Sequence, residues 1–537
     1  MVQRILGFLF LALMVSAFLQ CARRGAPSGG IKDVIPPKLL RAEPVNMSIN
    51  FKENKIRLYF DEYIKLKDLE KQLIVSPPLK HIPIITPQGS PRKYVEIIIK
   101  DTLRPNTTYT FNFGQSIVDN NEGNPSSYLT YVFSTGDYID SLTVSGVVVD
   151  GFNKKADPFI SVMLYELDST YTDSTIFKSP PNYITNTLDS TVIFHLKNLK
   201  EGKYAMFALK DEAKNNLFDQ KTDKIAFIKD TISLPTDSIY LLTLFKEIPD
   251  YSISVPNFAA NNKIIFGYQG DGQDIKINTL TALPDSVRTK ISKEPEKDTL
   301  NFWITPFTAD SLVFTVSNER EKIMDTFSVK TRKVAADTLI LQPNQRGGLE
   351  FGRPFYIGAN TPISKIDSTK INLWRNDSTE VKYTLSLDTI GNKIDFDFEV
   401  GPNENYALDL LPGAVEDFFS SQNDTLTFNL STKSYADFGN LRITLEGKVT
   451  YPLILQLTDE KGITKKELFA TEPKIFEFNH IAPAKYQIRV IHDSNGNRKW
   501  DTGNYLRDIQ PERVSYYPSI VEIRANWEME QTFTLSD

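Results

Sequence analysis

The sequence contains very little of what disulfide-rich secreted proteins and metalloenzymes depend on: one cysteine and four histidines in 537 residues. With one cysteine no intramolecular disulfide can form, so each domain must be held by its own hydrophobic core. The histidines show no HExxH or HxxEH zinc spacing. Gly-x-Ser-x-Gly, Gly-Lys-Ser/Thr and Gly-x-Gly-x-x-Gly motifs are also missing. The common hydrolase and nucleotide-binding signatures are therefore absent, and only a catalytic pair of distant carboxylates stays open.

An excess of positive charge is also missing. The formal net charge is −6, with charges of both signs interspersed and no basic stripe. Removal of an N-terminal leader containing Arg4 makes it −7, from 60 basic and 67 acidic residues. Nucleic acid is therefore excluded as an expected partner.

One long apolar run is present, at Ile5–Leu19, after a short segment with a single positive charge. Fifteen residues in a helix span roughly 22 Å, which is less than the ~30 Å of a bilayer core. The length predicts a signal peptide over residues 1–20. No second apolar run approaches 18 residues, so we expect no transmembrane helix after it.

Cys21, the only cysteine, follows this run after Gln20, and a Gly/Ser/Pro-rich stretch, Ala22–Asp33, comes next. We interpret residues 21–35 as a flexible tether. The arrangement resembles a bacterial lipoprotein, which implies that Cys21 is fatty-acylated, with palmitate among the chains, and forms the mature N-terminus. The alternative is an ordinary secretory leader with an incidental cysteine.

The rest of the chain predicts an all-β fold. Period-two alternation appears at Ile56–Phe60, Tyr109–Phe113 and Tyr486–Val490, while helical periodicity is nearly absent. Breaks rich in Asn, Gly, Pro and Asp recur about every ten residues, as in β-sandwiches. More than 500 residues exceed a single core, so three to five domains are expected.

A first internal repeat relates Leu103–Phe113 to Val400–Leu410. In each copy a Pro-Asn turn leads into a strand and an Asp-containing loop follows. A terminal threonine lies 26 positions after the tyrosine in both copies. The tyrosine beside the turn is expected to bury its ring and to bond its hydroxyl to nearby backbone. This pattern resembles the bacterial Ig-like domain named after the S-layer protein SbsA, over residues 36–137 and, in degenerate form, 341–435.

A second repeat has identical spacing in both copies. Phe194, Leu196, Leu199, Lys203, Tyr204, Asp211, Asn215 and Asp219 match Phe476, Phe478, Ile481, Lys485, Tyr486, Asp493, Asn497 and Asp501. Gly202-Lys203-Tyr204 resembles the late strand of transthyretin-like or carboxypeptidase-regulatory sandwiches, which implies such domains at 138–247 and 436–537. Residues 248–340 also alternate and are interpreted as a further β-sandwich.

The sharpest local motif is an Asx-rich loop that begins at Asp493. Oxygen-bearing groups lie at positions 1, 3, 5, 7 and 9, in the alternation by which tight loops ligate Ca²⁺. The candidate ligands are Asp493, Asn495, Asn497, the Lys499 carbonyl and Asp501, with a neutral Asn504 at position 12. The alternative is a turn closed by its own side-chain-to-backbone bonds. The matching loop Asp211–Asp219 has Ala213 at the third position, which disfavours calcium there.

A dispersed motif, Asp-Ser/Thr followed by a small, aliphatic or threonine residue, resembles the O-glycosylation acceptor of exported Bacteroidota proteins. Its simpler explanation is a turn that precedes a strand, and both can hold. The candidate hydroxyls belong to Thr102, Ser141, Ser169, Ser174, Ser190, Thr231, Ser238, Ser286, Thr299, Ser311, Thr338, Ser368, Ser378, Thr389 and Thr425.

Leader, tether and Ig-like domain together resemble the Ig-domain lipoproteins of Bacteroidota. The resemblance implies a lipid-anchored outer-membrane protein without enzymatic activity, which serves as a scaffold or accessory subunit of an assembly or secretion complex. The alternatives are carbohydrate binding, with Trp303, Trp374, Trp500 and Trp527 as candidates, and a hydrolase. Asp61 and Glu62 are considered as a catalytic carboxylate pair, but we expect them to lie at the end of a strand, in contact with water. Ala22-Arg23-Arg24 after Cys21 disfavour export to the cell surface without deciding the membrane face.

Overall fold

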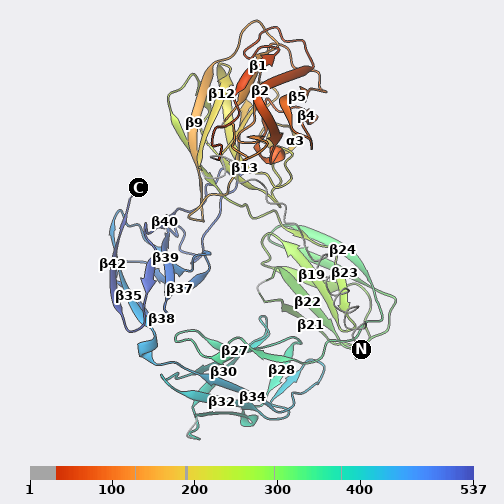
Figure 1. The fold of residues 1–537 in the computed structure, drawn as a ribbon. Coiled ribbons are helices and arrows are strands. Elements are labelled where there is room, and N and C mark those ends of the chain that lie inside the picture. Colours follow the sequence, from red (N-terminus) through yellow and green to blue (C-terminus); the bar gives the residue numbers. More distant parts are fainter. Residues whose placement is uncertain (1–31, 127, 188–190, 296, 376–377, 537) are drawn as a thin grey trace, which may run out of the picture. The chain divides into compact units, whose positions relative to one another are not determined.

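The computed structural model describes residues 32–126, 128–187, 191–295, 297–375 and 378–536. Strands form nearly all of the regular structure (Figure 1). The helices are single turns, α2 (Leu69–Gln72), α3 (Thr175–Lys178), η1 (Ser368–Lys370) and η2 (Tyr435–Asp437). In the part of the chain that the structure describes, no helix has the length and apolar character needed to cross a bilayer. The all-β prediction is confirmed.

The chain divides into two compact units. One comprises the chain up to Leu142 together with Asn198–Lys200, and the other comprises Thr143–Lys197 together with the chain from Glu201 onward.

The first unit contains two antiparallel sheets over one core. The larger sheet has the order β1 (Leu39–Glu43), β2 (Lys55–Leu66), β5 (Arg92–Ile98) and β4 (Ile84–Thr86), with β7 (Ile117–Asp119) also paired to β2. The other has the order β3 (Ile74–Ser76), β6 (Thr108–Asn112) and β8 (Thr130–Ser134). Alternate residues such as Ile56, Leu58 and Phe111 point into the core and are fully buried, as period-two patterning requires.

The Pro-Asn turn builds the same hydrogen-bonded corner in both copies of the first repeat. Asn106 and Asn403 occupy the turn with φ of 48° and 56°, which asparagine tolerates better than most residues. The buried Tyr109 accepts the Arg104 N–H through its hydroxyl at 2.9 Å, and Tyr406 accepts the Gly401 N–H at 2.8 Å.

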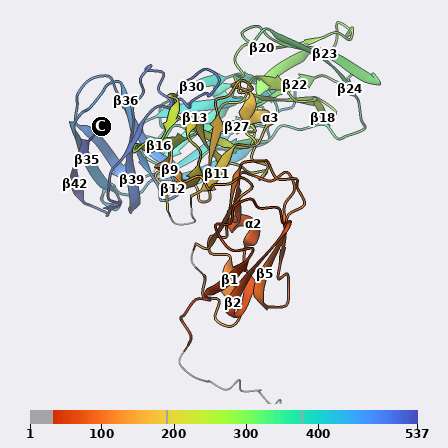
Figure 2. The same ribbon diagram turned by 90° about the horizontal axis from the view of Figure 1, so that it is seen from above.

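In the second unit, sheet pairing stays within four consecutive stretches of the chain. The first stretch has a sheet of β11 (Tyr183–Asn186), β10 (Ser161–Glu166), β13 (Gly202–Lys210) and β14 (Lys224–Phe227), with β15 (Ile232–Leu234) on β13. Its second sheet has the order β12 (Ile193–Leu199), β9 (Leu142–Asp150) and β16 (Ile239–Leu244), labelled in Figure 2. We call this stretch the second sandwich.

The next stretch, the third sandwich, has two sheets. The first sheet has the order β17 (Ser252–Ile253), β19 (Lys263–Gln269), β22 (Thr299–Ile304) and β21 (Thr289–Lys293), with β18 (Asn257–Ala260) paired to β19. The second has the order β20 (Ile275–Thr279), β23 (Ser311–Asn318) and β24 (Ile323–Lys330). Its core centres on Phe266, Phe302 and Phe314, whose rings meet edge to face, a favourable aromatic geometry.

The fourth sandwich follows. One sheet has the order β25 (Leu341–Pro343), β27 (Phe355–Ala359), β31 (Lys393–Phe398) and β30 (Tyr383–Asp388). A second has the order β26 (Gly347–Gly348), β34 (Leu426–Ser431), β32 (Asn405–Leu410) and β29 (Ile371–Arg375). The strands β28 (Ile363–Ile366) and β33 (Val415–Asp417) form a two-stranded sheet.

The fifth sandwich has the same sheet layout as the second. One sheet has the order β38 (Phe476–Ile481), β35 (Gly439–Gly447) and β42 (Glu528–Leu535), and the other β37 (Thr464–Ala470), β36 (Leu453–Thr458), β39 (Ala484–Ile491) and β40 (Val514–Tyr516), with β41 (Val521–Ile523) on β39. In both sandwiches the last strand runs parallel to the first, β16 to β9 and β42 to β35. The sequence repeat therefore corresponds to a repeated topology, while the domain boundaries remain predictions.

Candidate functional site

The candidate sites begin with the two modification predictions. Cys21 and Ser190 lie outside the described residues. Of the fourteen other Asp-Ser/Thr candidates, eleven are exposed and three, Ser174, Thr299 and Ser311, are partly buried. Several directly precede or begin a strand, among them Ser141, Thr231, Ser238 and Thr425. Several candidates therefore lie in turns that lead into strands, and most are accessible to solvent. The geometry is compatible both with O-glycosylation and with a purely structural turn.

Asp493 closes the Asx-rich loop through the backbone. Its side chain is completely buried, and it accepts N–H bonds from Gly496 at 2.8 Å, Asn497 at 3.1 Å and Arg498 at 2.8 Å. A carboxylate that receives three amide donors is well satisfied without a cation.

The structure brings the other predicted side-chain ligands together at one carboxylate. The side-chain amides of Asn495 and Asn497 both donate to Asp501 Oδ2, the latter at 2.7 Å. The Asn495 and Asn497 oxygens in turn accept the backbone N–H groups of Asn497 and Lys499. The geometry is therefore that of the hydrogen-bonded turn, and calcium at this loop stays a prediction. Among the described residues, no group of three or more His, Cys, Asp or Glu side chains is arranged to hold a metal.

The matching loop in the second sandwich closes in the same way. Asp211 accepts the backbone N–H of Asn216 at 2.7 Å, and the buried Asp223 accepts those of Glu212 and Asp219. Burial raises the pKa of Asp211, with the backbone bond from Asn216 opposing this. The loop shape is thus kept in both copies by carboxylate-to-backbone bonds.

The segment 500–512, which continues the Asx-rich loop, packs against the second sandwich. Trp500 contacts Phe152, with ring centroids 4.7 Å apart, and donates its indole N–H to the Glu512 carbonyl. Thr502 donates to the Lys246 carbonyl at 2.6 Å, and Gln510 donates to the Phe227 carbonyl. We call this contact, between the 500–512 segment and the second sandwich, the loop interface.

Tyr505 is the central side chain of the loop interface. Its ring meets Phe207 at 5.1 Å and Phe227 at 5.4 Å, both edge to face, while its backbone N–H donates to the buried Glu247 at 2.5 Å. Burial, together with a hydrogen bond to Tyr171, raises the pKa of Tyr505 well above its usual value. The tyrosine therefore stays neutral and acts as a packing anchor.

The facing loop of the second sandwich is held by its own hydrogen bonds and ion pairs. Asp150 accepts the backbone N–H groups of Phe152 and Asn153, and Lys224 bridges Asp150 and Asp157 at 2.7 Å to each. Burial opposes the lysine charge, but these two bonds outweigh it and raise the pKa of Lys224. Lys154, on the same loop, donates to Gln487 and to two backbone carbonyls of the fifth sandwich. The sequence motif identified the Asx-rich loop. It did not identify the loop after β9 that the fifth sandwich contacts, because that loop has no recognisable motif.

The four tryptophans differ sharply in exposure. Trp303 is 1 % exposed, Trp374 and Trp500 are partly buried, and Trp527 is 49 % exposed. Trp527 lines a groove of about 430 Å³ with Tyr517, Arg524 and Met529, and Arg524 lies 5.0 Å above its ring. Of the four candidates for sugar stacking, Trp527 alone presents a half-exposed ring.

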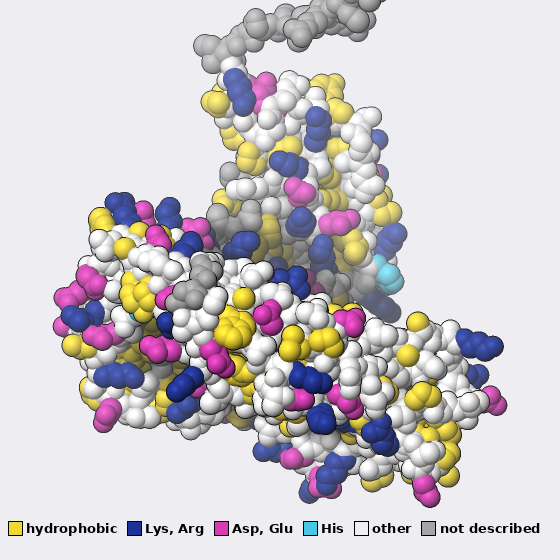
Figure 3. All heavy atoms as spheres, turned by 90° about the horizontal axis from the view of Figure 1, so that it is seen from below, with side chains coloured by type: hydrophobic (Ala, Val, Ile, Leu, Met, Phe, Trp, Pro, Cys, Tyr) yellow, Lys and Arg dark blue, Asp and Glu magenta, His cyan; other side chains and the backbone are white. Residues whose placement is uncertain are grey.

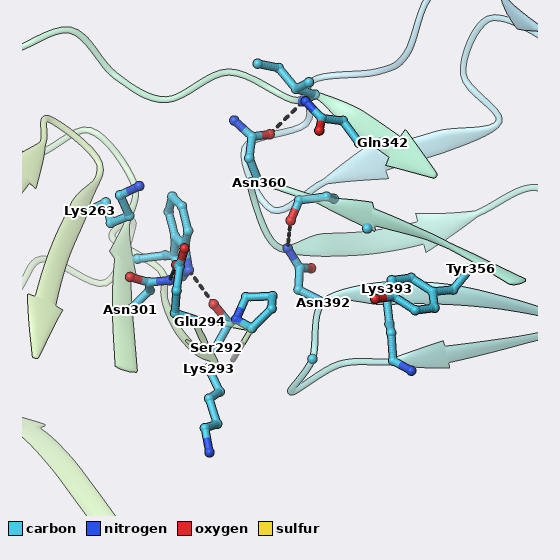
Figure 4. A pocket seen from close by; sticks show the side chains of 16 residues that line it. Lys263, Ser292, Lys293, Glu294, Asn301, Gln342, Tyr356, Asn360, Asn392 and Lys393 are labelled. Carbon is cyan, nitrogen blue, oxygen red and sulfur yellow. Dashed lines mark hydrogen bonds between the residues drawn. The ribbon is translucent and has the colours of Figure 1, made fainter. Parts of the chain in front are cut away.

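A cavity of about 520 Å³ lies between the third and fourth sandwiches (Figure 4). Its polar side chains are mostly used within the protein. Trp303 donates to Ser292 at 2.8 Å, Asn301 to Glu294 at 2.7 Å, and Asn392 to the Ala359 carbonyl at 2.7 Å. These wall groups therefore bond within their own sandwiches, which leaves few free donors for a ligand.

Asp61 and Glu62 are not a strand end, as expected from the sequence, but lie inside the 12-residue strand β2. The pairing with β5 shifts register between Tyr59 and Ile64, so these residues lie at an irregularity that lets the strand continue toward β7. Burial and the nearby Asp119 raise the pKa of Glu62.

On the face shown in Figure 3, side chains of both charge signs are interspersed, as the composition indicates.

Comparison with known proteins places residues 33–135 in the family described as bacterial Ig-like domain. No curated protein sequence matches the chain.

Among solved structures the chain is similar to domains 1–6 of the surface layer protein SbsC, at 11 % identity over 91 % of this chain and 67 % of that one, with a TM-score of 0.15. It is also similar to the Bacillus anthracis TIE protein, at 12 % identity over 95 % and 75 %, TM-score 0.13. A further match is BcpA, the major pilin subunit of Bacillus cereus, at 13 % identity over 74 % and 99 %, TM-score 0.13. At such scores these likenesses carry no functional argument. The chain is an all-β protein built of β-sandwiches, in which residues 33–135 match the bacterial Ig-like domain family.

Proposed function

We propose that this chain is a non-enzymatic lipoprotein of the outer membrane, anchored through Cys21, that serves as a scaffold or accessory subunit of an outer-membrane protein complex. The observation that carries the scaffold role is the loop interface. The loop that begins at Asp493, the candidate calcium site of the sequence, is closed by its own hydrogen bonds. It leads into the 500–512 segment, which bonds the fifth sandwich to the second. Because the residues of this motif are used to join two sandwiches, the site itself, and not the fold, favours a structural role over ligand binding.

The lipid anchor and the partner are tested separately. Cys21→Ser in the native host is expected to lower the mass by the lipid and to release the protein from the outer-membrane fraction. A stoichiometric partner is expected to co-purify with the parent in detergent. An unchanged mass and unchanged fractionation of Cys21→Ser contradict the anchor, while purification of the parent alone contradicts the complex.

We also propose O-glycosylation at several of the Asp-Ser/Thr positions. Their support is accessibility, because none of the fourteen described candidates is buried. Native protein is expected to show an intact mass above polypeptide plus lipid. A mass with no such excess contradicts this proposal.

Carbohydrate binding is the second candidate function, and the exposed ring of Trp527 on its groove favours it. Glycan-array binding by the purified chain should be lost in Trp527→Ala and kept in Trp500→Ala, whose ring faces Phe152 instead. Equal binding by both variants contradicts a sugar site at Trp527.

A further inference from the structure

The second and fifth sandwiches end in equivalent edge strands with different side chains. Gly151 N–H donates to the Leu244 carbonyl at 2.7 Å at the end of β16, and Lys448 N–H donates to the Leu535 carbonyl at 3.0 Å at the end of β42. Counting back from these carbonyls pairs Leu241 with Thr532 and Ile239 with Glu530. The two strands can therefore be compared position by position.

In the fifth sandwich, charge covers this edge. Glu530 lies opposite Arg442 of β35, and the Arg442 guanidinium pairs with Glu530 at 2.8 Å and with Glu477 of β38 at 3.1 Å. Charged side chains on edge strands are a common protection against pairing with another chain.

In the second sandwich, the same positions are apolar. Ile239 is 79 % exposed and Leu241 is 59 % exposed. Their cross-strand neighbours on β9 are Ser145 and Val147, so no charged side chain stands where Arg442 and Glu530 stand in the fifth sandwich. No residue of β16 is charged.

The outward backbone of β16 is also unpaired. Leu244 directs its carbonyl toward β9, and a Cβ built on Gly146 of β9 would come within 2.3 Å of the Tyr240 carbonyl, so Tyr240 faces β9 as well. Because strand residues alternate, the N–H and C=O groups of Ile239, Leu241 and Thr243 point away from β9. In the described part of the chain no strand pairs with β16 itself on that side. The first pairing there comes directly after it, where Phe245 exchanges two backbone hydrogen bonds with Ile225 of β14, so the open edge ends at Thr243.

We propose that the outer edge of β16 receives an extended polypeptide strand from a partner protein, with uncharged, largely apolar side chains on the face beside Ile239 and Leu241. A lipid cannot satisfy a row of backbone N–H and C=O groups, whereas an added strand satisfies each of them. The absence of charge at Ile239 and Leu241 and at their β9 neighbours, Ser145 and Val147, favours an uncharged partner face. This inference specifies how the scaffold of the proposed function holds its partner, and it rests on that function.

The test uses the full purified chain and a synthetic capped peptide of alternating Val and Thr, with two lysines at one end for solubility. Peptide binding is expected to slow hydrogen exchange at Ile239, Leu241 and Thr243. Leu241→Pro removes one outward N–H without touching the β9 ladder and is expected to weaken binding at least tenfold. The matched control, Thr532→Pro on β42, should bind like the parent. Leu241→Lys, which adds a protective charge, replaces Leu241→Pro if that variant does not fold.

Equal binding by parent and Leu241 variants, or no added protection at the three amides, overturns the proposal. A concentration-dependent dimer of the parent that Leu241→Lys dissolves also overturns it, because the occupant is then a second copy of this chain. Peptide binding in solution does not depend on the lipid, so loss of the Cys21 anchor and failure at β16 are distinguishable.

Discussion

The indole of Trp500 packs on the ring of Phe152, although the first belongs to the last sandwich of the chain and the second to a loop after β9. Arg489 places its guanidinium 4.3 Å above the same Phe152 ring, and Tyr516 donates its hydroxyl to the Phe152 carbonyl at 2.5 Å. One phenylalanine therefore has its ring and its backbone engaged by three residues of the fifth sandwich.

Trp500→Ala is expected to weaken the loop interface. Truncation removes the ring contact and the hydrogen bond to the Glu512 carbonyl, at a cost of about 2 kcal/mol in the free energy of unfolding. Thermal melting should show an earlier transition, and proteolysis should cut the 500–512 segment faster. The control is Trp527→Ala, whose half-exposed ring should matter little. Equal behaviour of the two variants contradicts a packing role for Trp500.

Chelation is expected to leave the protein unchanged. Asp493 already receives three backbone N–H bonds, and the amide nitrogens of Asn495 and Asn497 face Asp501. EDTA should therefore not move the melting curve, whereas Asp493→Ala should cost about 2 kcal/mol, because it removes the buried carboxylate that accepts three backbone N–H groups of the loop. A melting temperature that falls in EDTA and recovers with added Ca²⁺ supports the calcium prediction instead.

Local pattern predicted the strands and the corners well. Ile56–Phe60 lies in β2, Tyr486–Val490 lies in β39, and the buried hydroxyls of Tyr109 and Tyr406 bond to backbone as expected. These features depend on residues close in sequence, where alternation, turn preference and burial act on the same few positions.

Contacts between distant segments could not be predicted in the same way. Asp493 and Asn497 were identified by spacing, but nothing in the spacing indicates that Tyr505 fits among Phe177, Phe207 and Phe227. Aromatic residues are frequent throughout the chain, so the partner of any one ring depends on how sandwiches pack. The position of Asp61-Glu62 within β2 was missed for a related reason, since the register shift arises from pairing with both β5 and β7.

Removing the corner hydroxyls should have the same effect in both copies of the first repeat. Tyr109→Phe leaves the Arg104 N–H without its acceptor, and Tyr406→Phe does the same to Gly401. Each is expected to cost about 1 kcal/mol, measured by urea unfolding. Tyr63→Phe, at a 55 % exposed position of β2, is the control and should be neutral. A neutral result for both corner variants means that water or a neighbouring group replaces the hydroxyl.

Acid is expected to destabilise the fifth sandwich through His492. Burial, and then the nearby Arg513, lower the pKa of His492 from 6.5 to about 4, while Thr450 and Ser515 hold the neutral ring at 3.0 Å on either nitrogen. Because the folded pKa lies below the unfolded one, the stabilisation is complete above pH 6.5 and is lost as the pH falls toward 4. The loss is a few kcal/mol, since one pKa unit corresponds to about 1.4 kcal/mol. Urea unfolding at pH 7 and pH 4.5 should therefore differ less in His492→Gln than in the parent, whereas His195→Gln, at an exposed position of β12, should keep the parent's difference. A parent-like pH dependence in His492→Gln shows that other groups, chiefly carboxylates, account for the acid sensitivity.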